Sequence, residues 1–115
     1  MNDLQQLAGN LRRFAEERDW DQFHSPKNLA SALSVEAGEI LEHFQWQTEQ
    51  QSTSLSGEQL NEVALELADV LLYLVRLADK LTVDLLQVAH RKIAINAERY
   101  PVERSRGSSR KYTEL

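Results

Sequence analysis

The sequence predicts an all-α fold of the four-helix-bundle type, completed by oligomerisation, and three observations support this prediction. Only two prolines and four glycines interrupt the 115 residues. Apolar residues recur at helical spacing along most of the chain. Residues that commonly cap helices stand in front of several of these apolar runs.

The first two helices are predicted by an apolar stripe and by a clear start signal. A single stripe of Leu, Ala and Phe indicates a helix over residues 4–19, followed by an aromatic-rich connector at residues 20–24. Ser25 is a favourable N-cap residue, and Pro26 is well suited to the first helical position. We therefore expect the second helix over residues 26–44.

The last two helices follow a polar segment. Residues 47–54 have no apolar side chain and are expected to form a loop. The run Ser56-Gly-Glu-Gln59 fits a capping box, so the third helix is expected from there to about Lys80. Thr82 is expected to cap a fourth helix, which continues to about Arg99 and ends before a proline.

The charge distribution restricts the classes of partner. Residues 1–101 are predicted to form one helical domain, and residues 102–115 a basic, irregular C-terminal tail. The net charge of −5 argues against a protein that binds polymeric nucleic acid. The basic end suits a small polyphosphate ligand held together with a metal ion, although a solvated tail explains it equally well.

The composition also predicts a compartment. The chain has no cysteine, which excludes disulfides and thiolate metal sites and suits a reducing cytoplasm. The first ten residues are polar and lack the apolar stretch of a signal peptide. The most apolar segment, residues 60–81, carries too many charges for a membrane span. We expect a cytoplasmic protein without a membrane partner.

Two acidic pairs are the strongest functional signal in the chain. Glu36 and Glu39, and then Glu66 and Asp69, stand three residues apart within runs of apolar residues. A carboxylate among apolar side chains must lose its charge or find a cation, and hard divalent ions take oxygen ligands of this type. Exposed Glu pairs are common on helices, but a helical projection puts Glu36 inside the apolar stripe. The four carboxylates are therefore predicted to bind Mg²⁺.

The helix predicted over residues 57–80 is apolar on nearly all of its faces. In a chain of this length too few other helices are available to cover it. A second copy of the chain is the natural partner, so a dimer or a larger homo-oligomer is expected.

Further residues are candidates for holding a phosphorylated ligand. Lys92, Asn96 and Arg99 share one helix face and fit a phosphate clamp, although an exposed basic face has the same spacing. Trp20 and Trp46 flank the second helix beside polar segments, where they suit stacking on a nucleobase as well as ordinary core or interface packing.

The three histidines are weaker candidates. His24 suits a hydrogen bond to a base or a sugar, and equally a contact that holds its loop. His43 and His90 are expected to be structural or exposed.

Several segments together resemble a known family. The segments are Arg18-Asp-Trp-Asp-Gln-Phe-His24, Asn28-Leu29, Glu36-Ala-Gly-Glu39, Phe44-Gln-Trp46, Glu66-Leu-Ala-Asp69-Val-Leu-Leu-Tyr73, Lys92 to Pro101, and Ser109 to Leu115. With these residues the chain resembles the MazG-like all-α nucleoside triphosphate pyrophosphohydrolases, and among them the dCTP pyrophosphatase branch. The resemblance covers the chain from Arg18 onward, except for the loop at residues 47–59.

The resemblance implies an activity and a set of site residues. The activity is Mg²⁺-dependent hydrolysis of dCTP or a modified dCTP to dCMP and pyrophosphate, which clears unwanted nucleotides from the pool. The carboxylates would be metal ligands, one of them also the base, and family members assemble as dimers or as tetramers made of two dimers. The implied substrate contacts are Lys92 and Asn96 on the phosphate and sugar side, and Trp20, His24, Trp46 and Tyr73 around the nucleoside.

Two alternatives stay open at this point. The same chemistry on another nucleotide, such as dUTP or an oxidised purine nucleotide, would keep the metal ligands and change the base. A non-catalytic helical assembly module would keep the bundle and lack hydrolysis.

Overall fold

The computed structural model describes residues 2–115, and the described residues form helices connected by turns, without strands. The chain divides after Val83 into two compact units. The first unit contains α1 (Asp3–Glu17), the 3₁₀ helix η1 (Asp21–Phe23), α2 (Pro26–Phe44), α3 (Glu49–Ser52) and α4 (Gly57–Lys80). The all-α prediction is confirmed. Among the described residues, no helix is both long and apolar enough to cross a membrane.

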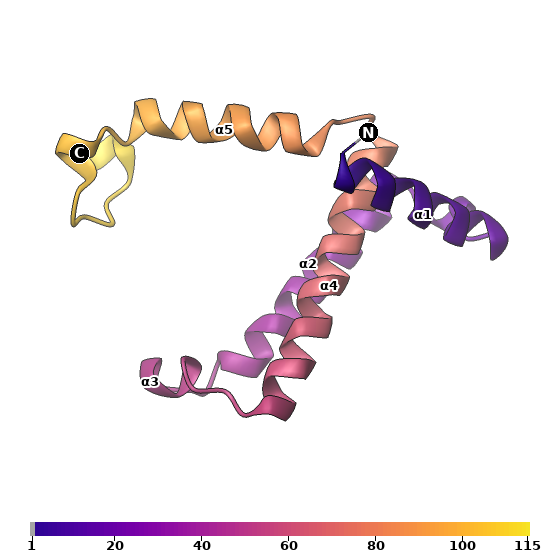
Figure 1. The fold of residues 1–115 in the computed structure, drawn as a ribbon, viewed down its shortest axis with the longest axis horizontal. Helices are drawn as coiled ribbons and strands as arrows, with labels where there is room; N and C mark the ends of the chain where they lie inside the picture. The colour runs from indigo at the N-terminus through magenta and orange to yellow at the C-terminus, as the bar shows by residue number, and fades with distance from the viewer. Residues whose placement is uncertain (1) are drawn as a thin grey trace. The chain divides into compact units, whose positions relative to one another are not determined.

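The first unit is built around the pair α2 and α4, which lie side by side along most of their length (Figure 1). Helix α1 packs against α4 as well. The apolar residues with the least exposed surface lie where these helices meet: Ala8, Ala15, Leu29, Val63, Val75 and Ala78. This small core aligns the facing sides of α2 and α4, on which Glu36, Glu39 and Glu66 lie.

The helix starts follow the capping signals in the sequence. The hydroxyl of Ser25 accepts a hydrogen bond from the backbone N–H of Asn28 at 3.1 Å, and Pro26 is the first residue of α2. At the start of α4, the side chain of Ser56 and that of Gln59 each accept a hydrogen bond from the other's backbone N–H. These contacts use backbone donors that a helix start otherwise leaves unpaired.

Two helices end with a residue in the left-handed backbone conformation. After α1, Asp19 has φ of 53°, and after α4, Thr82 has φ of 56°. In both places the N–H of this residue and the N–H of the next residue donate back to the last turn. After α4 these bonds run from Thr82 N to Asp79 O at 3.1 Å and from Val83 N to Ala78 O at 2.9 Å, which is the Schellman arrangement. The prediction that Thr82 caps the following helix is therefore wrong, because Thr82 belongs to the end of α4.

The expected loop at residues 47–54 contains one turn of helix, α3. Thr48 and Gln51 form a capping box there, with the Thr48 hydroxyl 3.1 Å from the Gln51 nitrogen. This local pair of hydrogen bonds stabilises a turn without any apolar contact, so a search for apolar periodicity overlooks it. Similarly, the aromatic connector includes η1.

The second unit contains α5 (Leu85–Arg99), α6 (Val102–Ser105) and the 3₁₀ helix η2 (Tyr112–Glu114). The side chain of Asp84, rather than Thr82, accepts the capping hydrogen bond from Gln87 N at 3.2 Å. The segment after Pro101, expected to be irregular, includes two short helical turns. The ring of Tyr112 packs edge-on against Tyr100, with centroids 6.0 Å apart, and fixes η2 to the end of α5.

Candidate metal centre

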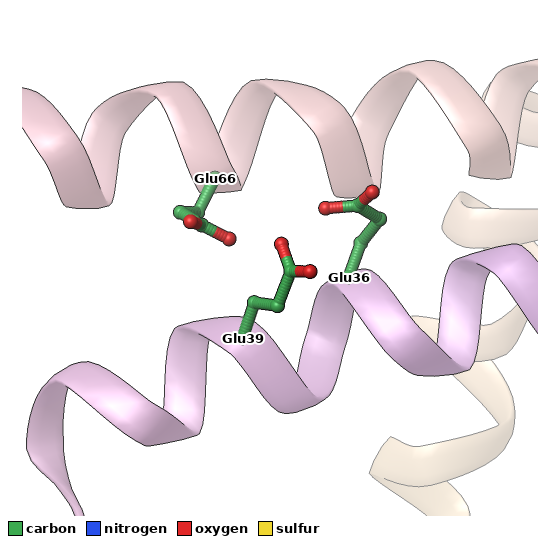
Figure 2. A group of neighbouring side chains, drawn as sticks. All are labelled: Glu36, Glu39 and Glu66. Atoms are coloured by element: carbon green, nitrogen blue, oxygen red, sulfur yellow. The ribbon is translucent and has the colours of Figure 1, made fainter.

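Three carboxylates from two helices converge between α2 and α4 (Figure 2). Glu36 and Glu39 project from one turn of α2, and Glu66 projects toward them from α4. One oxygen from each of the three lies within 4.8 Å of the other two. The spacing of three residues on α2 puts both Glu side chains on the same side of the helix, so the pairing of the helices is sufficient to bring Glu66 to them.

This cluster has unsatisfied acceptors. Glu36 Oε2 and Glu66 Oε2 are buried and accept no hydrogen bond from the described residues. Burial raises the pKa of both carboxyls above the ordinary value, and the neighbouring Glu39 raises the two pKa values further. Clustered carboxylates with unpartnered oxygens fit a hard divalent cation, whose charge would relieve both the desolvation and the repulsion.

The fourth predicted ligand, Asp69, stands one turn after Glu66 on α4. It is exposed and is not one of the three residues whose oxygens gather within 4.8 Å. Its negative charge nevertheless contributes to the raised pKa of Glu36. The structure thus brings three of the four predicted ligands together, and a direct role of Asp69 in metal binding stays a prediction.

His43 borders the cluster. Its Nε2 lies 3.6 Å from Glu66 Oε1, and the two side chains are about equally buried. The charge of a protonated His43 would lower the pKa of Glu66, in opposition to the effect of burial. We expected His43 to be structural or exposed. Its position four residues after Glu39, on the same face of α2, is the signal that places it beside the acidic pair.

The four residues predicted to surround a nucleoside differ from one another in exposure and in contacts. Trp46 is 88% exposed just beyond the end of α2, whereas the ring of Trp20 packs edge-on against Phe14 with centroids 5.8 Å apart. Tyr73 is half-buried on α4, one turn beyond Asp69. His24 accepts a hydrogen bond at Nδ1 from Arg76 Nε, at 3.2 Å. Contact of these four residues with a substrate stays a prediction.

The predicted phosphate clamp lies in the second unit. Lys92, Asn96 and Arg99 are all exposed on α5. The guanidinium of Arg99 is 4.9 Å from the ring centroid of Tyr112, a cation–π contact that ties it to η2. Phosphate binding by these residues stays a prediction.

One residue of the first unit has no place in the predicted site. Arg76 is only 4% exposed, which is unusual for an arginine, and it contacts Asp21 and Asp79 as well as His24. Its position gives a signal that sequence reasoning missed. It follows Asp69 and Tyr73 at helical spacing, so it extends the polar stripe of α4 that begins with Glu66.

A helical bundle that gathers inward-facing carboxylates from adjacent helices is a common design for binding divalent cations, and this protein has that arrangement. Residues 31–115 match the MazG-like family, and the chain belongs to this family.

Known proteins of similar sequence and structure support the assignment. The chain is 50% identical over 117 aligned residues to human dCTP pyrophosphatase 1, a match that covers 100% of this chain and 67% of the human protein. The mouse protein of the same name is 49% identical over the same lengths. A crystal structure of a pyrophosphatase from Archaeoglobus fulgidus has a TM-score of 0.81 and 35% sequence identity, covering 88% of this chain and 94% of that one.

Proposed function

We propose that this protein is a nucleoside triphosphate pyrophosphohydrolase that converts dCTP, or a dCTP with a modified base, to dCMP and pyrophosphate. The convergence of Glu36, Glu39 and Glu66 carries this proposal, because it supplies anionic ligands in the chemistry that metal-dependent phosphoryl transfer requires. The names of the human and mouse relatives support dCTP as the substrate. The resulting activity would clear unwanted cytosine nucleotides from the pool.

The carboxylates have two tasks in this proposal. Glu36, Glu39 and Glu66, with Asp69 at the edge, would hold one or more Mg²⁺ ions. Bound there, Mg²⁺ would supply positive charge near the phosphate oxygens and would favour deprotonation of the attacking water. One of the four carboxylates would accept the proton of the water that attacks the phosphorus.

The remaining candidates would bind the two ends of the substrate. The flat rings of Trp20, Trp46 and Tyr73 suit stacking on a base, and the high exposure of Trp46 is consistent with a ligand as its partner. His24 would donate a hydrogen bond to the nucleoside. On α5, Lys92, Asn96 and Arg99 combine two charges with an amide donor, as contacts to a triphosphate require.

We further propose that the protein is a homo-oligomer in the cytoplasm, either a dimer or a tetramer made of two dimers. Leu60 and Leu67 are 58% and 54% exposed on one face of α4, and Leu71 continues the same face. An apolar stripe of this kind on a long helix favours burial against another protein surface. The stripe supports a second copy as the partner, since closed homo-oligomers are the commonest assemblies of soluble proteins.

The function is tested by measuring pyrophosphate release from a panel of nucleotides at equal concentration. The panel contains dCTP, 5-methyl-dCTP, dUTP and an oxidised dGTP, each with Mg²⁺ and with a chelator. We expect cytosine nucleotides to give the highest kcat/KM, and the chelator to abolish release. A rank of dCTP below most of the others would overturn the proposed base.

The non-catalytic alternative is separated by calorimetry. Titration with a non-hydrolysable dCTP analogue should show binding that depends on Mg²⁺ if the protein is an enzyme. The absence of both metal-dependent binding and hydrolysis would identify an assembly module instead.

A further inference from the structure

Arg76 is the most buried charged residue that the proposed reaction does not use. Its Nη2 donates to Asp21 Oδ1 at 2.7 Å, its Nη1 is 3.5 Å from Asp79 Oδ2, and its Nε donates to His24 Nδ1. All three nitrogens of the guanidinium are thus used, each toward a different residue. A buried arginine with this many directed contacts fixes the geometry of its partners.

The contact with His24 has one possible chemical form. An arginine carries five N–H donors, accepts no hydrogen bond and stays protonated. The imidazole nitrogen that faces it must therefore be the acceptor, which means that Nδ1 of His24 carries no proton. The single proton of a neutral imidazole then resides on Nε2.

Burial and the neighbouring cations favour the neutral form of His24. Partial burial lowers its pKa first, and the positive charges of Arg76 and Lys80 lower it further, whereas Asp21 raises it. These are the charged groups that face the ring, from α4 and from its own loop. Asp21 is in turn shared, because its Oδ1 also accepts a hydrogen bond from Lys80. Asp79 is likewise shared, because both of its oxygens pair with Arg12 from α1.

The other ring nitrogen is available for a ligand. No described residue accepts a hydrogen bond from His24 Nε2, and the side chain is only half-buried. A polar hydrogen that the fold orients and leaves without an internal acceptor is a suitable donor toward an oxygen or nitrogen of a bound molecule.

We propose that Arg76 is a positioning residue that holds His24 in the tautomer protonated on Nε2, so that this nitrogen is a fixed hydrogen-bond donor to an acceptor on the nucleoside part of the substrate. This inference rests on the proposed function for the identity of the ligand. In this role His24 recognises the substrate and transfers no proton. A directed donor also discriminates against analogues in which the acceptor is missing.

The tautomer is tested without any turnover, by long-range ¹H–¹⁵N NMR of the ¹⁵N-labelled full chain. The His24 signals are assigned by their loss in His24→Asn. We expect an unprotonated Nδ1 and a protonated Nε2 at about pH 7 to 8. In Arg76→Lys, which keeps the charge and loses the planar fork, we expect a mixture of tautomers. Arg12→Lys is the matched control, because Arg12 contacts the same Asp79 and does not contact His24. A protonated Nδ1 in the wild type, or unchanged signals in Arg76→Lys, would overturn the inference.

The role in recognition is tested by kinetics. The loss of one directed hydrogen bond of about 1.4 kcal/mol corresponds to a change of about tenfold, so Arg76→Lys should raise KM for dCTP about tenfold with a smaller change in kcat. In a His24→Ala background, Arg76→Lys should have little further effect, because the residue through which it acts is gone. If Arg76→Lys raised KM by the same factor in the wild-type and His24→Ala backgrounds, Arg76 would have a purely structural role. A wild-type chain that hydrolyses no nucleotide would overturn the proposed function and the substrate part of this inference, while the NMR result would still decide the tautomer.

Discussion

Glu36 shows how a single side chain can cost stability and still be useful. One of its oxygens is buried without a hydrogen-bond partner, and three other carboxylates raise its pKa after burial has already done so. A residue selected for stability alone would be apolar at this position. Its placement is understandable if a bound cation supplies the partner that this oxygen lacks.

Replacing Glu36 by Gln should separate stability from activity. Hydrolysis should fall by at least about a hundredfold, since a charged ligand is lost, whereas the metal-free protein should gain thermal stability because repulsion is relieved. Burial and the neighbouring carboxylates raise the folded-state pKa of Glu36 above its ordinary value. Metal-free wild type therefore loses stability as pH rises from that ordinary value through the folded-state pKa. The variant loses less, because only Glu66 keeps a raised pKa.

The measurement is a melting curve in chelator at about pH 5 and pH 8, together with a pyrophosphate assay. The stability gain should be larger at the higher pH. Glu42→Gln, on the exposed side of α2, is the control and should change neither quantity. Unfolding of Glu36→Gln with no effect of metal would instead indicate a structural ion pair.

At the scale of the element, helix starts were more predictable than helix ends. Ser25 with Pro26 and Ser56 with Gln59 announce α2 and α4, because a capping side chain acts on the backbone of its own neighbours. The prediction for Thr82 was wrong because glycine normally occupies the left-handed position at a helix end. A β-branched threonine gives no indication in the sequence that the helix ends there. The convergence of Glu39 with Glu66 follows from helical spacing and apolar patterning, but the hydrogen bond between His24 and Arg76 joins residues 52 positions apart and has no local signature.

Replacing Thr82 by Gly should stabilise the protein. A non-glycine residue costs about 1–2 kcal/mol in the left-handed region, and glycine loses about 0.5–1 kcal/mol to backbone entropy. We therefore expect the free energy of unfolding in urea to rise by about 0.5–1 kcal/mol. Thr53→Gly is the matched control, since Thr53 follows α3 with φ of −96° and should lose stability. A loss of similar size at both positions would contradict the assignment of strain to Thr82.

For the whole molecule, the balance of buried and exposed apolar surface is the main feature. Few apolar side chains of the first unit are fully buried, and several leucines of α4 are exposed to solvent. The near-continuous apolar character of residues 57–80 indicated this excess from the sequence alone. The sequence did not indicate which face would stay uncovered, because that depends on how α1 and α2 pack against α4.

Introducing a charge on this open face should weaken assembly. Leu67→Lys places an ammonium where a leucine is 54% exposed in the single chain. Burial of a leucine contributes about 1.5–3 kcal/mol, so the dissociation constant of the oligomer should rise at least about tenfold. Sedimentation across a range of concentrations measures this change, with Gln50→Lys on α3 as the control for added charge. A monomeric wild type, or an unchanged constant, would exclude this face as the interface.

The division of the acidic trio between two helices has a consequence for the order of events in the cell. Glu36 and Glu39 lie close together on α2 in any helical state, but Glu66 joins them only after α4 has been synthesised and has docked. A nascent chain that ends before residue 66 therefore lacks one of the three clustered carboxylates, and a cation that needs all three would bind only after the tertiary structure has formed. On the proposed function, the ion would therefore bind late in folding, only after the two helices have packed together.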